Sequence, residues 1–436
     1  MKFKEIRKKY PKFVYEKYFW KISGNNLEIF FDFKIEPGIR FKPKIIIENI
    51  PKRWLAPGVN HNFNHLIFHL GLIEMISYWK ATCSPIIEIK AGSLSREQIR
   101  WWQDLIKNGM GQFFYENKIG FQNPCFIVSN PVGFGKFIVS NPVGFGKFIC
   151  SEQKTKPLII TKLKNRYLVP FSGGRDSIAT LEKLKEQKKE ITLFSVNPIK
   201  QIQKTAEVSG MRKQIVVKRG IDKKLLELNK KGYLNGHTPF TALLSFLSVL
   251  CAFLFDCKRI VFSNEKSANE GNTKYLGKTI NHQYSKSSEF EKKFKSYCKK
   301  YLVKNINYHN FLRKYTDLEI SKMFGKYPKY FSVFSSCNAA MKIKPSLKSR
   351  WCGKCPKCLF VYMTLYPYLK KQELIKIFNE DLFEKKELLS IMKSLIGQGK
   401  HKPFECVGTY KESRTALNLC LKKARKSGKI PYLLTR

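Results

Sequence analysis

The stretch Tyr167-Leu-Val-Pro-Phe-Ser-Gly-Gly-Arg-Asp-Ser-Ile-Ala-Thr180 decides the fold. Residues 167–171 form a short apolar run that predicts a buried parallel strand, and the residues from Ser177 onward have the spacing of a helix. A strand, a glycine turn and a helix start together present free backbone N–H groups and the positive end of a helix to an anion. The sequence therefore predicts a phosphate-binding turn in an α/β domain.

Each side chain of this turn has an expected role. Gly173 and Gly174 let the backbone approach phosphate oxygens because neither carries a Cβ. Ser172 and Ser177 add hydroxyl donors, and Asp176 supplies a carboxylate of the kind that Mg²⁺ prefers. The turn is not a Walker A loop, which has Lys followed by Ser or Thr. The pattern S-G-G-x-D-S resembles the pyrophosphate loop of the ATP pyrophosphatase (PP-loop) superfamily, whose members cleave ATP to AMP and pyrophosphate.

The rhythm of strand and helix continues after the turn. Apolar runs at 191–196, 214–218 and 259–262 predict further strands, so residues 161–334 are expected to form a doubly wound parallel sheet that binds ligands at the carboxyl ends of its strands. The segment from Thr238 to Phe255 has no charged residue. Its length and its place between two predicted strands indicate a buried crossover helix and not a membrane span.

An N-terminal α+β domain is expected at residues 1–120. Alternating apolar and polar residues up to about 58 predict an antiparallel sheet, and two helical stretches follow. The second stretch, Ser95 to Asn117, has Ser95 as N-cap and Gln98 as its capping-box partner. A linker is predicted at 121–160, where the segment Phe126 to Lys136 is followed at once by an identical copy, Phe137 to Lys147.

A histidine pattern and a tryptophan pair in the N-terminal part are both interpreted as structural. His61, His65 and His69 recur at helical spacing, but no Cys or carboxylate nearby completes a metal site, so they are interpreted as core or surface residues. The pair Trp101 and Trp102 is expected to pack in the interior.

The amino-acid composition limits which binding partners and which cellular compartment are expected. The formal charge of +48 and the pI near 9.9 suggest nucleic acid as a partner. The excess is mostly Lys spread over the whole chain, which lacks bidentate base-reading geometry, so nucleic acid is the less favoured partner. Twelve cysteines and an N-terminus without the apolar core of a signal peptide predict a reducing, cytoplasmic location.

A second constellation lies near the C-terminus. Cys352, Cys355 and Cys358 form a double C-x-x-C, and Cys337 lies upstream of them. Four thiolates at this spacing suit tetrahedral Zn²⁺ in a structural site, which is favoured over disulfides and over a [4Fe–4S] cluster. Cys406 is an alternative fourth ligand. Residues 335–436 are therefore predicted to hold a Cys₄ zinc knuckle and a helical C-terminal region.

The loop and the cysteines together are similar to the 7-cyano-7-deazaguanine synthases, which are zinc-bearing PP-loop enzymes that activate a carboxylate with ATP. Further blocks give a closer resemblance, to the UDP-N-acetylmuramoyl-L-alanyl-L-glutamate epimerases. The chain departs from that family's pattern at Arg175, where Lys is expected, and in the duplicated segment. The matching blocks, in order, are Asn108–Tyr115, Asn235–Pro239, Phe262–Ala268, Asn281–Lys286, Ser335–Asn338, Ser349–Cys358 and His401–Gly408.

This resemblance implies an epimerase that converts the terminal L-Glu of a UDP-linked peptidoglycan precursor to D-Glu, with ATP consumed to AMP and pyrophosphate. It implies that the loop residues hold ATP and Mg²⁺, and that Arg175 offsets phosphate charge. Glu265, His237 and His282 are candidates for proton transfer or Mg²⁺ ligation, and Lys286 for binding the UDP diphosphate or the γ-carboxylate. A carboxylate-activating ligase and an RNA-modifying PP-loop enzyme are the alternative functions.

Overall fold

The computed structural model describes residues 3–55, 64–120, 138–139, 148–149, 163–211, 213–340 and 350–435. His61 and almost all of the predicted linker at 121–160, with its duplicated segment, therefore lie outside the described residues. Within that linker, only strands β6 (Ile138–Val139) and β7 (Phe148–Ile149) are described, and they pair antiparallel with each other.

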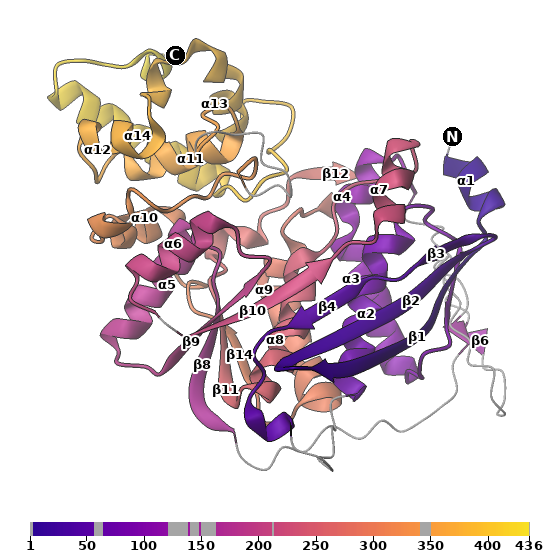
Figure 1. Cartoon of the computed structure of the whole chain (residues 1–436). Coiled ribbons are helices and arrows are strands. Elements are labelled where there is room, and N and C mark those ends of the chain that lie inside the picture. Colours follow the sequence, from indigo (N-terminus) through magenta and orange to yellow (C-terminus); the bar gives the residue numbers. More distant parts are fainter. Residues whose placement is uncertain are drawn as a thin grey trace.

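A single large sheet runs through the molecule, and its second half is parallel (Figure 1). The predicted strands are all present, and the doubly wound parallel sheet is confirmed. An additional edge strand, β14, was not predicted, because its sequence Asn-Tyr-His-Asn has too few apolar residues to be distinguished from a loop. In spatial order these strands are β14 (Asn307–Asn310), β11 (Cys257–Phe262), β8 (Lys164–Pro170), β9 (Ile191–Val196) and β10 (Gln214–Gly220).

The strand order creates a switch point between β8 and β11. From β8 the chain moves to β9 and β10 on one side, and it then returns to β11 and β14 on the other side. The connections that leave the carboxyl ends of β8 and β11 therefore run in opposite directions and leave a crevice between them. The glycine turn at 171–174 follows β8, and Glu265 follows β11, so the fold brings both predicted site segments to this crevice.

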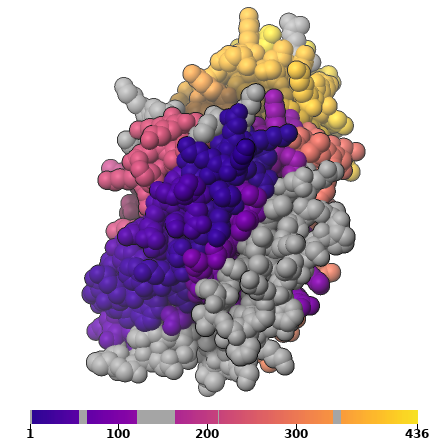
Figure 2. All heavy atoms as spheres, turned by 90° about the vertical axis from the view of Figure 1, so that its right-hand side faces the viewer, coloured from indigo at the N-terminus to yellow at the C-terminus, as the bar shows by residue number. Residues whose placement is uncertain are grey.

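The N-terminal half of the sheet is joined edge to edge to the parallel half. The expected antiparallel strands are present, and β4 pairs antiparallel with β10, with Ile47 opposite Val217. N-terminal residues consequently cover much of the face shown in Figure 2. The strands are β1 (Lys12–Ser23), β2 (Asn26–Glu36), β3 (Ile39–Phe41), β4 (Lys44–Ile47) and β5 (Ile86–Ile89).

Helices cover both faces of the sheet, and the strands alternate between the two resulting cores. On β8, Leu168 packs into one apolar cluster while Val169 packs into the other, as the two-residue period of a strand requires. The first cluster includes helices α2 (Asn64–Trp79), α3 (Arg96–Gly109), α8 (Phe240–Leu254) and α9 (Ser288–Tyr297). The second includes α5 (Arg175–Glu186), α6 (Lys200–Val208) and the C-terminal region.

The C-terminal region is helical, as predicted, and packs beside α10 (Asp317–Phe324) at one end of the molecule (Figure 1). Its helices are α11 (Pro356–Leu365), α12 (Lys371–Phe378), α13 (Leu389–Leu395) and α14 (Tyr410–Lys426). The remaining described α-helices are α1 (Phe3–Lys9), α4 (Gly111–Glu116) and α7 (Lys223–Lys230).

Several local predictions are confirmed. Ser95 caps α3 in a complete capping box with Gln98. His69 is buried in the core and His65 is half-buried, and Nδ1 of His69 bonds to the carbonyl oxygen of His65. Trp102 is also buried and donates to the Tyr297 hydroxyl at 3.0 Å. Helix α8 is the buried crossover, and within the described ranges no helix combines the length and apolarity that a bilayer span requires.

Candidate active site

The glycine turn connects β8 to α5 with its backbone close to neighbouring groups. Gly173 has φ of +68°, which a side chain would strain, and a Cβ there would lie 3.3 Å from Cα of Ile202. Gly174 is the N-cap of α5 and has no side chain to occupy the helix end. The hydroxyl of Ser177 donates to the carbonyl oxygen of Gly174 at 3.0 Å and lies 3.4 Å from the hydroxyl of Ser172. The turn therefore combines a helix start with two adjacent hydroxyl groups.

A short C-terminal segment is bonded directly to this turn. The backbone N–H of Ser335 donates to the carbonyl oxygen of Gly173, and the N–H of Arg175 donates to the Ser336 hydroxyl, both at 3.3 Å. Ser335 also accepts a bond from the N–H of Cys337 at 3.2 Å. Residues 335–337 thus connect the glycine turn to the predicted metal knuckle.

Arg175 is buried beneath the turn and forms bonds inside the protein. Its Nε donates to Asp176 at 2.7 Å, and Nη2 bonds to Asp317, at the start of α10. Its Nη1 donates to Ser321 at 2.9 Å and to Thr364 of α11 at 3.1 Å. The predicted role of Arg175 on phosphate stays a prediction; these bonds support a positioning role, which ties the turn to α10 and α11.

Asp176 is partly accessible, and its surroundings favour its ionised form. Its side chain is 25% exposed, and one of its oxygens accepts the bond from Arg175. Burial opposes ionisation, but the positive charges of Arg175, Lys357 and Lys286 outweigh it and lower the pKa of the carboxyl group. An ionised carboxylate in an anion-binding turn fits the oxygen ligands that Mg²⁺ uses beside phosphates.

Glu265 and Lys286 lie in the same electrostatic neighbourhood. Burial and the negative charges of Asp176 and Asp317 raise the pKa of Glu265 to about 7, against the opposing effect of Lys286. Arg313 fixes the backbone of both, because it donates to the carbonyl oxygen of Glu265 at 2.7 Å and to that of Lys286 at 2.5 Å. A carboxyl group with a pKa near neutrality is suited to proton transfer.

The raised pKa of Glu265 predicts a pH-dependent stability. The folded state holds the proton of the Glu265 carboxyl group more tightly than the unfolded chain, in which the pKa is 4.5. The contribution of this group to the stability of the fold is therefore fully present below about pH 4.5 and is lost as the pH rises through about 7. Gln cannot ionise, so Glu265→Gln is expected to be the more stable protein at pH 8, by about 3 kcal/mol. Urea unfolding of the wild type and the variant at pH 5 and pH 8 measures this effect. The same difference in unfolding free energy between the two proteins at both pH values would contradict the prediction.

His237 and His282 form a neighbouring pair. Their ring centroids are 4.5 Å apart. Burial lowers the pKa of His237 to about 3 and that of His282 to about 4, with Lys286 contributing to both. Nδ1 of His282 donates to Oε1 of Gln112, which leaves Nε2 of a neutral ring as a proton acceptor. The structure therefore brings His237, His282, Glu265, Lys286 and Asp176 into one site region.

The sulfur of Cys406 contacts this region and is not part of the four-sulfur cluster. Nζ of Lys286 donates to this sulfur at 3.0 Å, and Nζ of Lys357 bonds to the carbonyl oxygen of Cys406. The residues Lys357, Asp317 and Ser335 were missed by sequence reasoning. A Lys between two cysteines gives no signal of its own, and Asp317 is separated from Arg175 by 142 positions.

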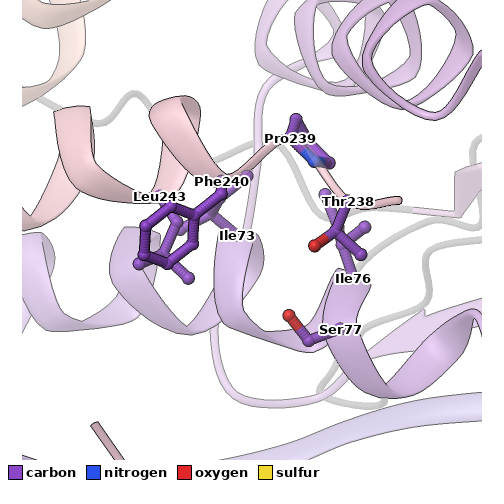
Figure 3. A pocket seen from close by; sticks show the side chains of 7 residues that line it. All are labelled: Ile73, Ile76, Ser77, Thr238, Pro239, Phe240 and Leu243. Atoms are coloured by element: carbon purple, nitrogen blue, oxygen red, sulfur yellow. The ribbon is translucent and has the colours of Figure 1, made fainter. Parts of the chain in front are cut away.

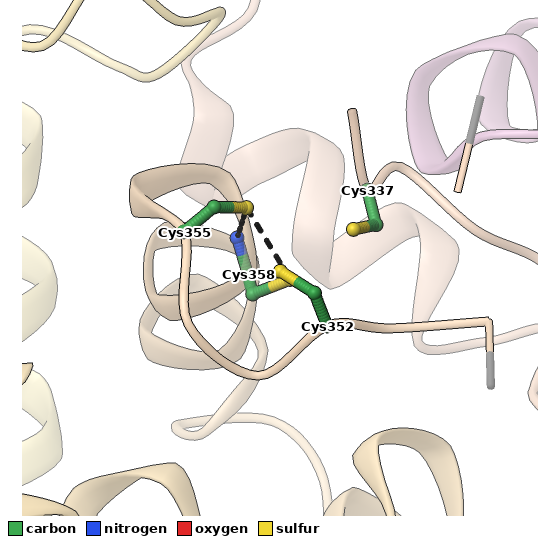
Figure 4. A group of neighbouring side chains, drawn as sticks. All are labelled: Cys337, Cys352, Cys355 and Cys358. Atoms are coloured by element: carbon green, nitrogen blue, oxygen red, sulfur yellow. Dashed lines mark hydrogen bonds between the residues drawn. The ribbon is translucent and has the colours of Figure 1, made fainter. Parts of the chain in front are cut away.

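The four predicted ligands Cys337, Cys352, Cys355 and Cys358 form a compact cluster (Figure 4). Their sulfur atoms all lie within 4.8 Å of one another, with Cys352 and Cys355 at 3.6 and 3.5 Å from Cys358. Sulfurs bound tetrahedrally at about 2.3 Å from zinc are about 3.8 Å apart, so the cluster fits this ion. Cys355 is the N-cap of α11, and its sulfur accepts a hydrogen bond from the N–H of Cys358.

Loss of one ligand is expected to release the metal. Cys358→Ser should weaken zinc affinity by about 100-fold or more, which corresponds to a stability loss of about 3 kcal/mol under limiting metal. Metal content per chain and thermal unfolding with and without a chelator measure this. One zinc per wild-type chain and a lower Tm for the variant are expected. Iron with acid-labile sulfide in the wild type would instead indicate a cluster.

A separate hollow lies between α2 and the start of α8 (Figure 3). It has no charged residue among its lining side chains, which are Ile73, Ile76, Ser77, Thr238, Pro239, Phe240 and Leu243. Its mainly apolar lining offers neither an anion site nor acid–base groups, so the chemistry is assigned to the glycine turn and its surroundings.

These features define a class: an α/β protein with a PP-loop-like turn at the switch point of its sheet and a Cys₄ cluster that can bind a metal. The model of the MurL N-terminal domain matches residues 4–311, and that of the MurL C-terminal domain matches residues 333–431. The chain belongs to the family of UDP-N-acetyl-alpha-D-muramoyl-L-alanyl-L-glutamate epimerases.

Three relatives carry this epimerase name. The protein from Xanthomonas oryzae pv. oryzae is 32% identical over 81% of this chain and 74% of its own length. Those from a Micromonospora species and from Salinispora tropica are 37% and 36% identical, over 58% and 62% of this chain and 56% and 58% of their own lengths. A solved structure, a predicted subunit of tRNA methyltransferase from Methanocaldococcus jannaschii, is 17% identical over 37% of this chain and 74% of that chain, with a TM-score of 0.22.

Proposed function

We propose that this protein is an ATP-dependent epimerase that converts the terminal L-Glu of UDP-N-acetylmuramoyl-L-alanyl-L-glutamate to D-Glu. The reaction passes through an acyl-adenylate and releases AMP and pyrophosphate. The proposal rests on one observation, the grouping of the predicted site residues around the glycine turn, at the switch point of the sheet. These residues are Asp176, Glu265, Lys286 and the pair of His237 and His282. Family membership supports the identity of the substrate.

The activation step uses the turn and its neighbours. The helix start, the backbone of Gly173 and Gly174 and the hydroxyls of Ser172 and Ser177 bind the phosphates of ATP, while Asp176 is the residue that would hold Mg²⁺. This ion, when bound, would neutralise phosphate charge and favour pyrophosphate as a leaving group. Lys286, which is half-buried, supplies a positive charge for an anionic group of the substrate. The carboxylate oxygen of the terminal glutamate then attacks the α-phosphorus, and pyrophosphate leaves.

Adenylation makes the stereochemical step accessible. A free carboxylate opposes loss of the Cα proton because the resulting carbanion would lie beside a negative charge. The acyl-adenylate has lost that charge and accepts the electron pair on its carbonyl oxygen, so the Cα proton becomes more acidic. Closure of the preceding alanyl amide oxygen onto the acyl carbon would give an oxazolone, which loses its configuration easily. Water then hydrolyses the activated intermediate.

Exchange of labelled pyrophosphate into ATP tests the activation step. The purified protein with ATP and Mg²⁺ is expected to catalyse this exchange only when the muramoyl dipeptide is present. Added ammonium separates the proposal from a carboxylate-amidating ligase, which would form a stable amide. Accumulation of the amide, or exchange that is independent of the dipeptide, would contradict the proposal.

A further inference from the structure

Cys406, which is paired with Lys286, has no assigned role in the chemistry above. Nζ of Lys286 donates to Sγ of Cys406 at 3.0 Å. Cys406 is half-buried. Among the cysteines in the described ranges it stands apart, because four form the metal knuckle and the others are buried, namely Cys83, Cys251, Cys257, Cys298 and Cys420.

The surroundings of Cys406 favour its thiolate. Burial opposes ionisation, but the positive charges of Lys286 and Lys357 outweigh it and lower the pKa of the thiol. The thiolate in turn helps to raise the pKa of Lys286, against the effect of burial. An ammonium group that donates to a sulfur atom is a common way of activating a cysteine for proton transfer or nucleophilic attack.

The position of Cys406 is fixed beside the glycine turn. Lys357, in the first turn of α11, donates its N–H to Glu405 at 2.9 Å and bonds through Nζ to the carbonyl oxygen of Cys406. Asp176, in the first turn of α5, lies close enough to affect the ionisation of the thiol. The same lysine, Lys286, acts on Asp176 and Glu265. The thiol therefore lies among the charged groups that surround the glycine turn.

We propose that Cys406, held by Lys286, removes the Cα proton of the activated glutamate. This inference rests on the proposed function and names the base that it requires. The Cα–H bond breaks, its electron pair forms the enolate of the acyl group, and the proton forms an S–H bond on Cys406. The enolate takes a proton from water on the opposite face, and the thiol returns its proton to solvent. Each turnover therefore places one solvent hydrogen at Cα.

Separate measurement of the two half-reactions tests the role of Cys406. Cys406→Ser is expected to keep pyrophosphate exchange near the wild-type rate while epimerisation, followed as deuterium uptake at Cα in D₂O, falls by about 100-fold or more. Cys420→Ser, a change of the same kind in the core of α14, should keep both activities. Epimerisation by Cys406→Ser at near the wild-type rate would overturn the inference. Absence of exchange in the wild-type protein would instead overturn the proposed function.

Thiol alkylation supplies a readout that is independent of activity. In the zinc-loaded protein, iodoacetamide is expected to label Cys406 first, as located by peptide mass spectrometry. Lys286→Gln should slow this labelling by about tenfold, because the thiolate loses its ammonium partner. Equal labelling rates in the two proteins would contradict the activated pair. A glutamyl thioester trapped on Cys406 during turnover would show a covalent role and would also overturn proton transfer.

Discussion

Asp176→Asn is expected to lower pyrophosphate release by about 10²–10³-fold, the range found when one charged or hydrogen-bonding group is removed from a transition state. The carboxylate lies in the first turn of α5, at the glycine turn, and its pKa is held low by Arg175, Lys357 and Lys286 against the effect of burial. Asn keeps the shape but cannot supply the charge that a magnesium ion needs.

The rate of pyrophosphate release at saturating ATP measures this effect. Glu186→Gln is the matched control, because Glu186 ends the same helix and its side chain is 51% exposed. The control should retain the wild-type rate, and Asp176→Asn should keep a wild-type circular dichroism spectrum. Turnover by Asp176→Asn within about threefold of wild type would remove the assignment of the turn to ATP.

Arg175→Met is expected to destabilise the folded protein by about 3–5 kcal/mol. The guanidinium is 1% exposed and bonds to Asp176, Asp317, Ser321 and Thr364. Met fills similar space, but it leaves the buried Asp317 carboxylate without its cation. The change is costly because it leaves a buried charge without a partner. The attraction within the ion pair contributes less, because it is offset by the cost of removing both charges from water.

Urea unfolding provides the measurement for this second prediction. Arg166→Met is the matched control, because Arg166 pairs with Glu190 at 2.6 Å but the side chains are 28% and 53% exposed. A solvent-exposed pair contributes at most about 1 kcal/mol. Equal destabilisation by the two substitutions would show that Arg175 is not the central connection between the turn, α10 and α11.

The contiguous motifs were predictable from sequence, and the long-range pairs were not. The residues of the glycine turn lie close together in the sequence, and so do those of the Cys₄ set. Local backbone geometry therefore largely determines how each group is arranged. The buried bond between Arg175 and Asp317 joins residues that no local pattern relates. The same reason applies to the pairing of β4 with β10, which makes one sheet of the N-terminal and parallel halves.

Cys406 shows most clearly what could not be predicted from the sequence. Sequence offered it as an alternative metal ligand, since a cysteine near a zinc motif has that chemistry. The structure completes the cluster with Cys337 and places Cys406 against Lys286. The choice between the two roles depends on how the segment at 401–408 is held in the fold, where Asn272 donates to the carbonyl oxygen of Pro403 at 2.7 Å. Such tertiary placement has no counterpart in spacing along the chain.

Chiral analysis of the product glutamate, combined with quantification of AMP, tests the central claim most directly. The purified protein, with Mg²⁺, ATP and the muramoyl dipeptide that ends in L-Glu, is predicted to form D-Glu and AMP together, and to form neither when ATP is omitted. Glutamate that remains entirely L while AMP accumulates, or D-Glu formed without ATP, would contradict an epimerase that works by activating the carboxylate.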